Sequence, residues 1–260
     1  MTADLLSRHL RDLPAFRALL RATEARFYAT IDLPQPTLDV GCGDGHFAAT
    51  TFRNKIAVGI DPQWQSLHEA SLRNGYCGLT QAAGDRLPFT NAAFASAISN
   101  SVLEHIPDVQ SVLNEVSRLL LRGAPFVFCV PSDNFLAMLS VSRTLRAWGL
   151  PAIAVAYESF FNRISRHHHC DSPAIWQARL ASAGFAVERH WYYFSEGALR
   201  ALEWGHFLGL PALVTKILFG RWVLVPTPAN LKLTDYLLRR HFEEPLPARG
   251  AYLFFIARKM

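Results

Sequence analysis

The sequence predicts an α/β protein with a mostly parallel sheet, helices on both of its faces, and helical inserts. Three observations predict this class. Short apolar runs alternate with helical patterns over residues 37–132, and this alternation builds parallel sheets covered on both faces. A glycine-rich turn follows the first apolar run, and one more helix-and-strand pattern returns near the end of the chain. Half of the 260 residues are hydrophobic, which suffices for one large domain with elaborate inserts.

Positive charge is concentrated late in the chain. The formal net charge is +5, and only 18% of the residues are charged. Residues 38–132 hold six Lys/Arg against eight Asp/Glu, whereas residues 198–242 hold six against two, a balance of +4. This excess lies in an apolar segment and forms no basic stripe with interleaved aromatic residues. We therefore expect no nucleic-acid partner.

Cysteine usage and hydropathy predict a cytoplasmic protein. None of the four cysteines shares a C-x-x-C spacing, so we expect reduced thiols. The N-terminus carries charges throughout and lacks the apolar region of a secretory signal. The longest candidate for a membrane span, Trp204–Thr215, is interrupted by Pro211 and falls short of the ~20 residues that a span needs.

Residues 1–34 are predicted to form an N-terminal helical cap. Leucine and aromatic side chains recur on one face of residues 4–30, which predicts one or two amphipathic helices with a break at Pro14. Pro34 and Pro36 end this region and lead into the first strand.

Residues 35–132 are predicted to form the α/β core. The pattern predicts strands over residues 37–40, 55–60, 76–81, 94–99 and 125–130, and helices from His46, over 63–73 and over 108–121. Asp108 or Ser111 is the expected N-cap of the last of these helices, and Gly123 its stop.

The remaining chain alternates inserts with the end of the sheet. Residues 133–172 predict a helical insert and residues 196–250 an apolar, basic insert. Residues 173–195 and 251–260 complete the core, with a helix over Ser172–Gly184 and strands over 185–194 and 251–257. Ser172 is the expected N-cap of that helix.

Polar and glycine residues follow each of the first four strands. The stretch after the first strand contains Gly41, Gly43 and Gly45, and glycine suits a turn that needs positive φ or close approach to a ligand. Asp61 ends the second strand and Asp85 follows the third. Ligands of parallel sheets bind outside the carboxyl ends of the strands, so these residues predict one pocket in which Asp61 accepts ribose hydroxyls.

These motifs resemble those of class I S-adenosylmethionine-dependent methyltransferases, in particular the small-molecule, type 11-like subgroup that shares an L-E-H-[IV] stretch. The resemblance rests on LDVGCGDG from Leu38, GID from Gly59, GDRLPF from Gly84 and SNSVLEHIPD from Ser99. It implies a Rossmann-like, seven-stranded sheet whose last strand runs antiparallel between the fifth and the sixth. A dinucleotide dehydrogenase is the rival, but its turn usually reads G-x-G-x-x-G and it has no acidic residue at the Asp85 position.

The resemblance implies S-adenosylmethionine as the cofactor and assigns residues to it. Asp39, Gly41 and Gly43 would contact the methionine part, Asp61 the ribose, Gly84, Asp85 and Arg86 the adenine, and Asn100 and Ser101 the methyl-donor end, with Cys42 and Pro62 also binding the cofactor.

Methyl transfer from a sulfonium needs in-line alignment of the nucleophile, and a base only for a weakly acidic acceptor. His105 is the first candidate base by position and His46 the weaker one. The acceptor is expected to be a small hydrophobic molecule methylated at O, C or N. His105, His168, His169 and Tyr157 are candidates for contact with it. We expect no metal, because the run His167–Cys170 lacks the spaced pairs of a zinc site and Ser101 replaces a glutamate of related metal sites.

The inserts leave alternatives open. The apolar residues of 198–225 predict a subdomain that packs on the sheet or on a second subunit of a homodimer. The basic residues among them point instead to a hydrophobic substrate site, or to peripheral attachment to the inner, anionic membrane surface. The alternative to a methyltransferase is a non-catalytic protein of the same fold that binds the cofactor or works at a membrane or protein surface.

Overall fold

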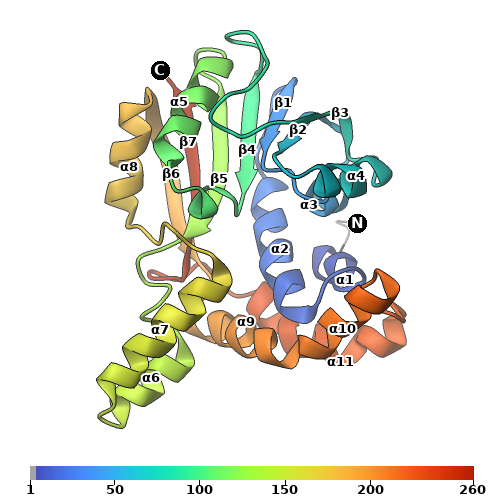
Figure 1. Cartoon of the computed structure of the whole chain (residues 1–260), viewed down its shortest axis with the longest axis vertical. Helices are drawn as coiled ribbons and strands as arrows, with labels where there is room; N and C mark the ends of the chain where they lie inside the picture. The colour runs from blue at the N-terminus through green and yellow to red at the C-terminus, as the bar shows by residue number, and fades with distance from the viewer. Residues whose placement is uncertain (1–3) are drawn as a thin grey trace.

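The structure, a computed structural model, describes residues 4–260 and centres on one seven-stranded sheet (Figure 1). The strand order is β3–β2–β1–β4–β5–β7–β6. The strands are β1 (Thr37–Val40), β2 (Ile56–Asp61), β3 (Tyr76–Gln81), β4 (Ser96–Asn100), β5 (Pro125–Pro131), β6 (Phe185–Tyr193) and β7 (Tyr252–Lys259). The first five strands are parallel, and β7 runs antiparallel between β5 and β6. The predicted sheet and its antiparallel last strand are confirmed.

Helices cover both faces of the sheet, as predicted. On one face α5 (Val109–Leu119) and α8 (Pro173–Ser182) bury a layer that includes Trp176. On the other face α2 (Ala15–Tyr28), α3 (His46–Thr51) and α4 (Trp64–Leu72) bury a layer that includes Tyr28. Two apolar layers of this kind stabilise a central sheet by removing both of its faces from water.

Local sequence signals set the ends of these elements. The side chain of Asp108 accepts a hydrogen bond from the backbone N–H of Ser111 at 3.2 Å and caps α5. Ser172 caps α8 in the same way. Strand β2 ends at Asp61, as predicted, and β4 extends to Asn100, one residue beyond its predicted end. Both side chains therefore lie at the carboxyl edge of the sheet, where ligands bind.

The N-terminal helices pack beneath this carboxyl edge. Helix α1 (Leu5–Leu10) and α2 are separated at Pro14, as expected, and residues 1–3 of the predicted cap lie outside the described residues. The hydroxyl of Tyr28 donates a hydrogen bond to the carbonyl of Val127 in β5 at 3.3 Å. Helix α2 is thereby fixed against the sheet next to the predicted pocket.

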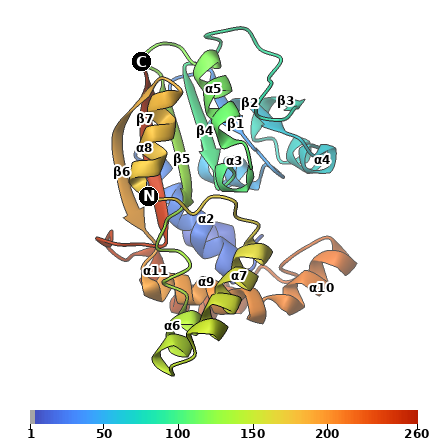
Figure 2. The same cartoon turned by 60° about the vertical axis from the view of Figure 1, so that its left-hand side comes forward.

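The two inserts form the helical part that lies below the sheet in Figures 1 and 2. It contains α6 (Ser140–Ala147), α7 (Pro151–Ser165), α9 (Glu196–Leu208), α10 (Leu210–Phe219) and α11 (Pro228–Phe242). The buried carboxylate of Glu203 joins three of these helices, because it accepts hydrogen bonds from the backbone N–H of Ser140 at 2.6 Å and from the hydroxyl of Tyr157 at 2.7 Å. Both inserts are helical, as predicted, while the boundaries of the five segments stay a prediction.

Within residues 4–260, no helix combines the length and the hydrophobicity needed to cross a lipid bilayer.

Candidate active site

The glycine turn between β1 and α3 forms one wall of a large cavity. Gly41 and Gly43 adopt positive φ angles of 82° and 54°. A side chain at Gly41 would collide with Val102, whereas one at Gly43 would meet nothing within 4 Å. Gly41 is therefore needed for close packing, and Gly43 leaves open space where the backbone faces the cavity.

Asp61 ties this turn to the second strand. One carboxylate oxygen accepts the backbone N–H of Gly43 at 3.0 Å, and the other accepts that of Gln63 at 2.9 Å. Both contacts hold the carboxylate at the cavity wall. The half-buried side chain keeps lone pairs for a further donor, such as a ligand hydroxyl.

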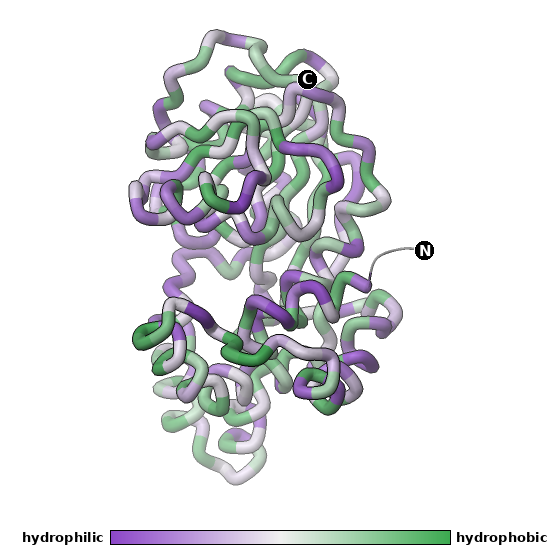
Figure 3. The backbone as a smooth tube through the Cα atoms, turned by 90° about the vertical axis from the view of Figure 1, so that its right-hand side faces the viewer, coloured by the Kyte–Doolittle hydropathy of each residue, from purple (hydrophilic) through white to green (hydrophobic). Residues whose placement is uncertain are grey.

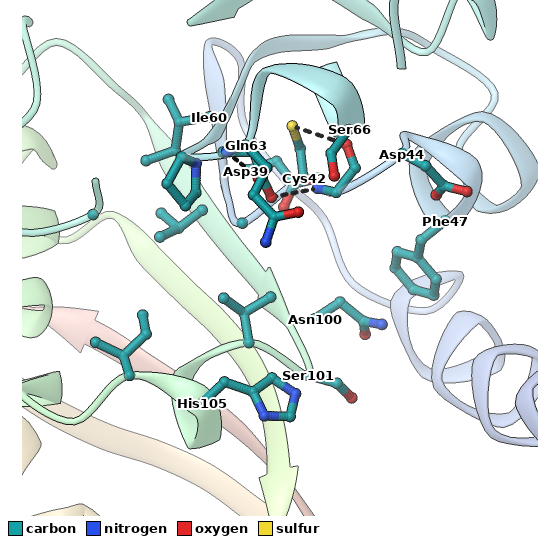
Figure 4. A pocket seen from close by; sticks show the side chains of 18 of the residues that line it. Asp39, Cys42, Asp44, Phe47, Ile60, Gln63, Ser66, Asn100, Ser101 and His105 are labelled. Atoms are coloured by element: carbon teal, nitrogen blue, oxygen red, sulfur yellow. Dashed lines mark hydrogen bonds between the residues drawn. The ribbon is translucent and has the colours of Figure 1, made fainter. Parts of the chain in front are cut away.

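The cavity measures about 910 Å³ and lies between the carboxyl edge of the sheet, helix α2, and Lys216 and Trp222 of the late insert. Figure 4 shows Asn100, Ser101 and His105 on one side of it, and Asp39 and Cys42 on the other. Its size falls in the upper range of small-molecule sites, which is enough for a ligand that buries most of its surface.

Most of the residues predicted to bind the cofactor line this cavity: Asp39, Gly41, Cys42, Gly43, Asp61, Pro62, Gly84, Asp85, Asn100 and Ser101. Both candidate bases, His46 and His105, line it too. Arg86 is exposed and lies outside the lining.

The structure does not bring the other predicted substrate residues to the cavity. Tyr157 instead donates its hydroxyl to Glu203 between the helices of the inserts. The backbone N–H groups of His168 and His169 donate to the carbonyl of Glu104 at 2.7 and 3.2 Å. The Nε2–H of His169 donates a hydrogen bond to the carbonyl of Ile106 at 3.0 Å. These histidines therefore brace the loop after β4. Among residues 4–260, no three His, Cys, Asp or Glu side chains converge as metal ligands would.

Asp39 is buried at the end of β1 behind the glycine turn. The hydroxyl of Tyr76 donates to its carboxyl at 2.6 Å. Burial raises the pKa of Asp39 to about 7, even though the Tyr76 hydrogen bond acts in the opposite direction.

A buried carboxylate from the N-terminal cap reaches Asn100 and Ser101 at the end of β4. Glu24 of α2 is fully buried. It accepts hydrogen bonds from the side chains of Arg21 at 2.7 Å, Asn100 at 2.8 Å, Ser101 at 3.0 Å and Tyr193 at 2.9 Å. This network fixes two predicted site residues and one arginine.

Sequence reasoning missed this network and the cationic wall beside it. Arg17 and Arg21 line the cavity from α2, and Lys216 lines it from α10. Arg17, Arg21 and Glu24 stand four and three residues apart, so they share one face of the helix. That polar spacing on an otherwise apolar helix was the signal available in the sequence.

His105 is held in a form that can accept a proton. It follows β4 in the short helix η1 (Leu103–His105). Its Nδ1–H donates to the carbonyl of Arg166 at 2.9 Å, because a carbonyl can only accept. Desolvation lowers the pKa of His105, so the ring is neutral near pH 7 and Nε2 carries a lone pair.

His46 is less suited to proton transfer. The ring is buried, and its Nε2 lies 3.4 Å from a carboxylate oxygen of Asp12 and 3.4 Å from the hydroxyl of Thr50. An aromatic neighbour is His9, with ring centroids 5.1 Å apart. These contacts engage the Nε2 atom of His46 within the protein.

Glu104 gives the site a pH-dependent component of stability. It is buried, one carboxyl oxygen has no hydrogen-bond partner among residues 4–260, and burial raises its pKa to about 8. The folded protein then keeps a proton that the unfolded chain releases above its ordinary pKa near 4.3. The free energy of unfolding is therefore expected to fall as pH rises from about 5 to 8, by up to ~1.4 kcal/mol per pH unit for this group.

Glu104→Gln is expected to remove this component. Urea unfolding at pH 5, 6, 7 and 8 should show that the free energy of unfolding of the variant increases relative to that of the wild type as the pH rises. Asp39, whose raised pKa of about 7 acts with the same sign, stays in both proteins and cancels in the comparison. Parallel pH profiles of the two proteins would show that Glu104 is ionised in the folded state.

Comparison with known proteins identifies the core. Residues 38–128 match the family described as methyltransferase domain. The chain is 30% identical over 138 residues to an uncharacterized methyltransferase of Mycobacterium sp. (strain JLS), covering 45% of this chain and 54% of that protein. Over 89 residues it is 33% identical to one of Mycobacterium leprae (strain TN), covering 33% of each. The chain thus spans about half the length, or less, of these curated relatives.

Solved structures share the fold over nearly the whole chain. A S-adenosylmethionine-dependent methyltransferase of Thermotoga maritima, described as a possible histamine N-methyltransferase, aligns with a TM-score of 0.57 and 15% identity, covering 95% of this chain and 91% of that one. The geranyl diphosphate C-methyltransferase of Streptomyces coelicolor A3(2) aligns with a TM-score of 0.55 and 14% identity, covering 92% and 76%. The [4+2]-cyclase SpnF aligns with a TM-score of 0.55 and 17% identity, covering 94% of this chain and 82% of that one. At these identities the likeness concerns the fold, and with the family match it confirms the predicted class I resemblance.

Proposed function

We propose, on the premise that residues 38–128 match the methyltransferase domain family, that the chain transfers a methyl group from S-adenosylmethionine to a small hydrophobic acceptor. The acceptor atom is O, C or N, and the transfer is an in-line displacement. The activity, its acceptor and a cytoplasmic location are parts of this proposal.

The main observation in support of this proposal is the open space beside the backbone of Gly43. The backbone there faces the cavity, and no atom lies within 4 Å of the place that a Cβ methyl group would take. The Asp61 carboxylate binds the N–H of the same residue. A nucleoside can approach such a backbone closely while its hydroxyls reach the carboxylate. The residues present therefore fit the cofactor.

Residues on opposite walls would hold the two ends of the cofactor. Asp61 would accept the ribose hydroxyls, and Asp85 would lie beside the adenine. Arg17 and Arg21 supply positive charge suited to a carboxylate such as that of the methionine part. When bound, S-adenosylmethionine supplies an electrophilic methyl group on a sulfonium whose departure needs no proton.

The chain's own chemical task is then to orient the acceptor, exclude water and take up a proton where the acceptor is a hydroxyl. Orientation alone can contribute ~7–11 kcal/mol to lowering the barrier. Nε2 of His105 is the acceptor for the proton, since the ring is neutral and its Nδ1–H is bound to Arg166.

His105→Ala is expected to lower kcat by about 10²- to 10⁴-fold for a hydroxyl acceptor while leaving cofactor affinity unchanged. The measurement follows transfer of tritiated methyl from S-adenosylmethionine into organic-extractable products of a small-molecule extract. His168→Ala serves as the matched control, because this exposed histidine lies outside the cavity lining. Equal rates for both variants would remove His105 from the proton transfer.

A non-catalytic role on the same fold is the second candidate. The fold does not by itself imply methyl transfer, since the fold neighbour SpnF is described as a [4+2]-cyclase; a chain of this fold that binds the cofactor without turnover is the corresponding alternative here. Binding of S-adenosylhomocysteine without any turnover of S-adenosylmethionine over a broad acceptor panel would favour this candidate. We propose that the protein binds no nucleic acid. We further propose that residues 198–225 contact either a second copy of the chain, in a homodimer, or the membrane surface.

A further inference from the structure

Helix α10 lies on the outside of the protein although its sequence is apolar. None of its residues is buried. The side chains of Ile217, Leu218 and Phe219 are 73%, 67% and 62% exposed. Leu210, Leu213 and Val214 are exposed on the same helix, and Leu208 precedes it with 77% exposure. Soluble monomers rarely leave so many contiguous apolar side chains in water, so this helix marks an interaction surface.

Helix α11 carries a second set of exposed apolar residues at the same edge of the helical part. Leu233, Tyr236 and Leu237 are 67%, 76% and 52% exposed, and their spacing of three and four residues places them on one helical face. Figure 1 shows α10 and α11 at the same lower edge of the helical part, where Figure 2 shows them diverging, and Figure 3 views the molecule from that side. We call the exposed apolar residues of 208–219 and 233–237 the α10–α11 surface.

Positive charge flanks the α10–α11 surface. Arg221, Lys232 and Arg240 are exposed, and no carboxylate among residues 4–260 forms an ion pair with them. The two acidic residues of 198–242 are both neutralised within the protein: Glu203 is buried among hydrogen-bond donors, and Asp235 pairs with Arg239 at 2.6 Å. Within residues 198–242 the surface is therefore apolar and cationic, and Glu243, which follows α11, lies 3.8 Å from the guanidinium of Arg239.

The same surface borders the cavity. Lys216 and Trp222 belong both to this edge and to the cavity lining. The ammonium of Lys216 lies 3.6 Å from a carboxylate oxygen of Glu69 on α4, across the cavity rim. A molecule that leaves an apolar phase at α10 is thus next to the entrance of the site.

We propose that the α10–α11 surface docks on the interface of an anionic phospholipid bilayer and that the acceptor enters the cavity from the lipid. Apolar side chains on one face with basic residues at its edges are the arrangement that binds such an interface. A second copy of the chain is the less suitable occupant, since an isologous contact would gather the unpaired cations of both copies, Arg221, Lys232 and Arg240, around one interface without acidic partners. The docking on a bilayer does not depend on the proposed methyl transfer, whereas the entry of the acceptor from the lipid rests on that proposed function.

Flotation with vesicles tests the docking. The full chain is expected to float with phosphatidylcholine vesicles that contain phosphatidylglycerol, and far less with phosphatidylcholine alone. The double variant Ile217→Asp/Leu218→Asp should lower the bound fraction by at least about tenfold. Lys232→Gln and Arg240→Gln should each weaken binding about fivefold at low salt. Trp148→Asp is the matched control, because Trp148 is 72% exposed but lies beyond α6, outside the surface.

Two outcomes overturn the proposal. The first is the absence of flotation with anionic vesicles. The second is a dimer of the wild type, seen by light scattering, that the Ile217→Asp/Leu218→Asp variant dissociates while vesicle binding stays unchanged. Titration with S-adenosylhomocysteine reports separately on the cofactor site, so loss of docking and failure of the proposed function are distinguishable.

Discussion

Gly43→Ala is expected to weaken binding of S-adenosylhomocysteine by about 10- to 100-fold while the protein keeps its fold. A methyl group at this position meets no protein atom within 4 Å and so enters the space assigned to the cofactor. Such overpacking costs about 1–3 kcal/mol. The positive φ of 54° adds a strain of about 1–2 kcal/mol to the folded chain, which a protein of this size tolerates. Calorimetric titration measures the affinity and urea unfolding the stability.

Gly123→Ala is the matched control for this prediction. Gly123 also has a positive φ, 79°, and open space around its Cβ position, but it lies in the turn between α5 and β5 and outside the cavity lining. The two variants should therefore lose similar stability and differ in affinity alone. Equal affinities of both variants would place the ligand elsewhere than at the glycine turn.

Glu24→Ala is expected to lower the free energy of unfolding by about 3–5 kcal/mol. The change leaves the Arg21 guanidinium without its partner in the protein interior and removes the acceptor of Asn100, Ser101 and Tyr193. At about 2–4 °C per kcal/mol, the melting temperature should fall by about 10 °C. Urea unfolding and thermal scans measure both quantities.

Tyr193→Phe provides the comparison. It removes one of the four hydrogen bonds to Glu24 and leaves the charge pair with Arg21 intact, so a loss of about 1 kcal/mol is expected. A Glu24→Ala loss no larger than that of Tyr193→Phe would show that the buried carboxylate does not organise the site.

The sheet and the glycine wall were predictable because their signals are local. Each of the strands 37–40 and 76–81 is a short apolar or β-branched run with turn residues at its end, and Ser172 caps a helix through its own neighbours. Parallel pairing then brings Asp61 and Asn100 to one edge without further information.

The N-terminal contribution to the site depends on tertiary docking, which no local pattern encodes. Glu24 meets Asn100 across 76 positions of sequence and Tyr193 across 169. The helical period showed that α2 has a buried face, but it did not show that a polar residue on that helix would be buried too.

The histidine run and the apolar inserts show a second limit of sequence patterns. His168 and His169 contribute backbone N–H groups that brace a loop, and a pattern of side chains does not reveal that role. In the late insert, Leu199 and Leu202 are buried whereas Leu213 and Ile217 are exposed, although both pairs have helical spacing. Hydrophobic periodicity identifies the apolar face of a helix, but it does not show whether that face packs inside the protein or is exposed.

Calorimetric titration of S-adenosylhomocysteine into the wild type and Asp61→Ala tests the central claim most directly. The wild type should bind one equivalent. The variant should bind at least about tenfold more weakly, since it loses a charged acceptor for the ribose hydroxyls and the contact with the Gly43 N–H. Asp108→Ala, at a carboxylate that caps α5 on the cavity rim, should bind as the wild type does. No binding by the wild type, or equal binding by wild type and Asp61→Ala, would contradict the assignment of this cavity to S-adenosylmethionine.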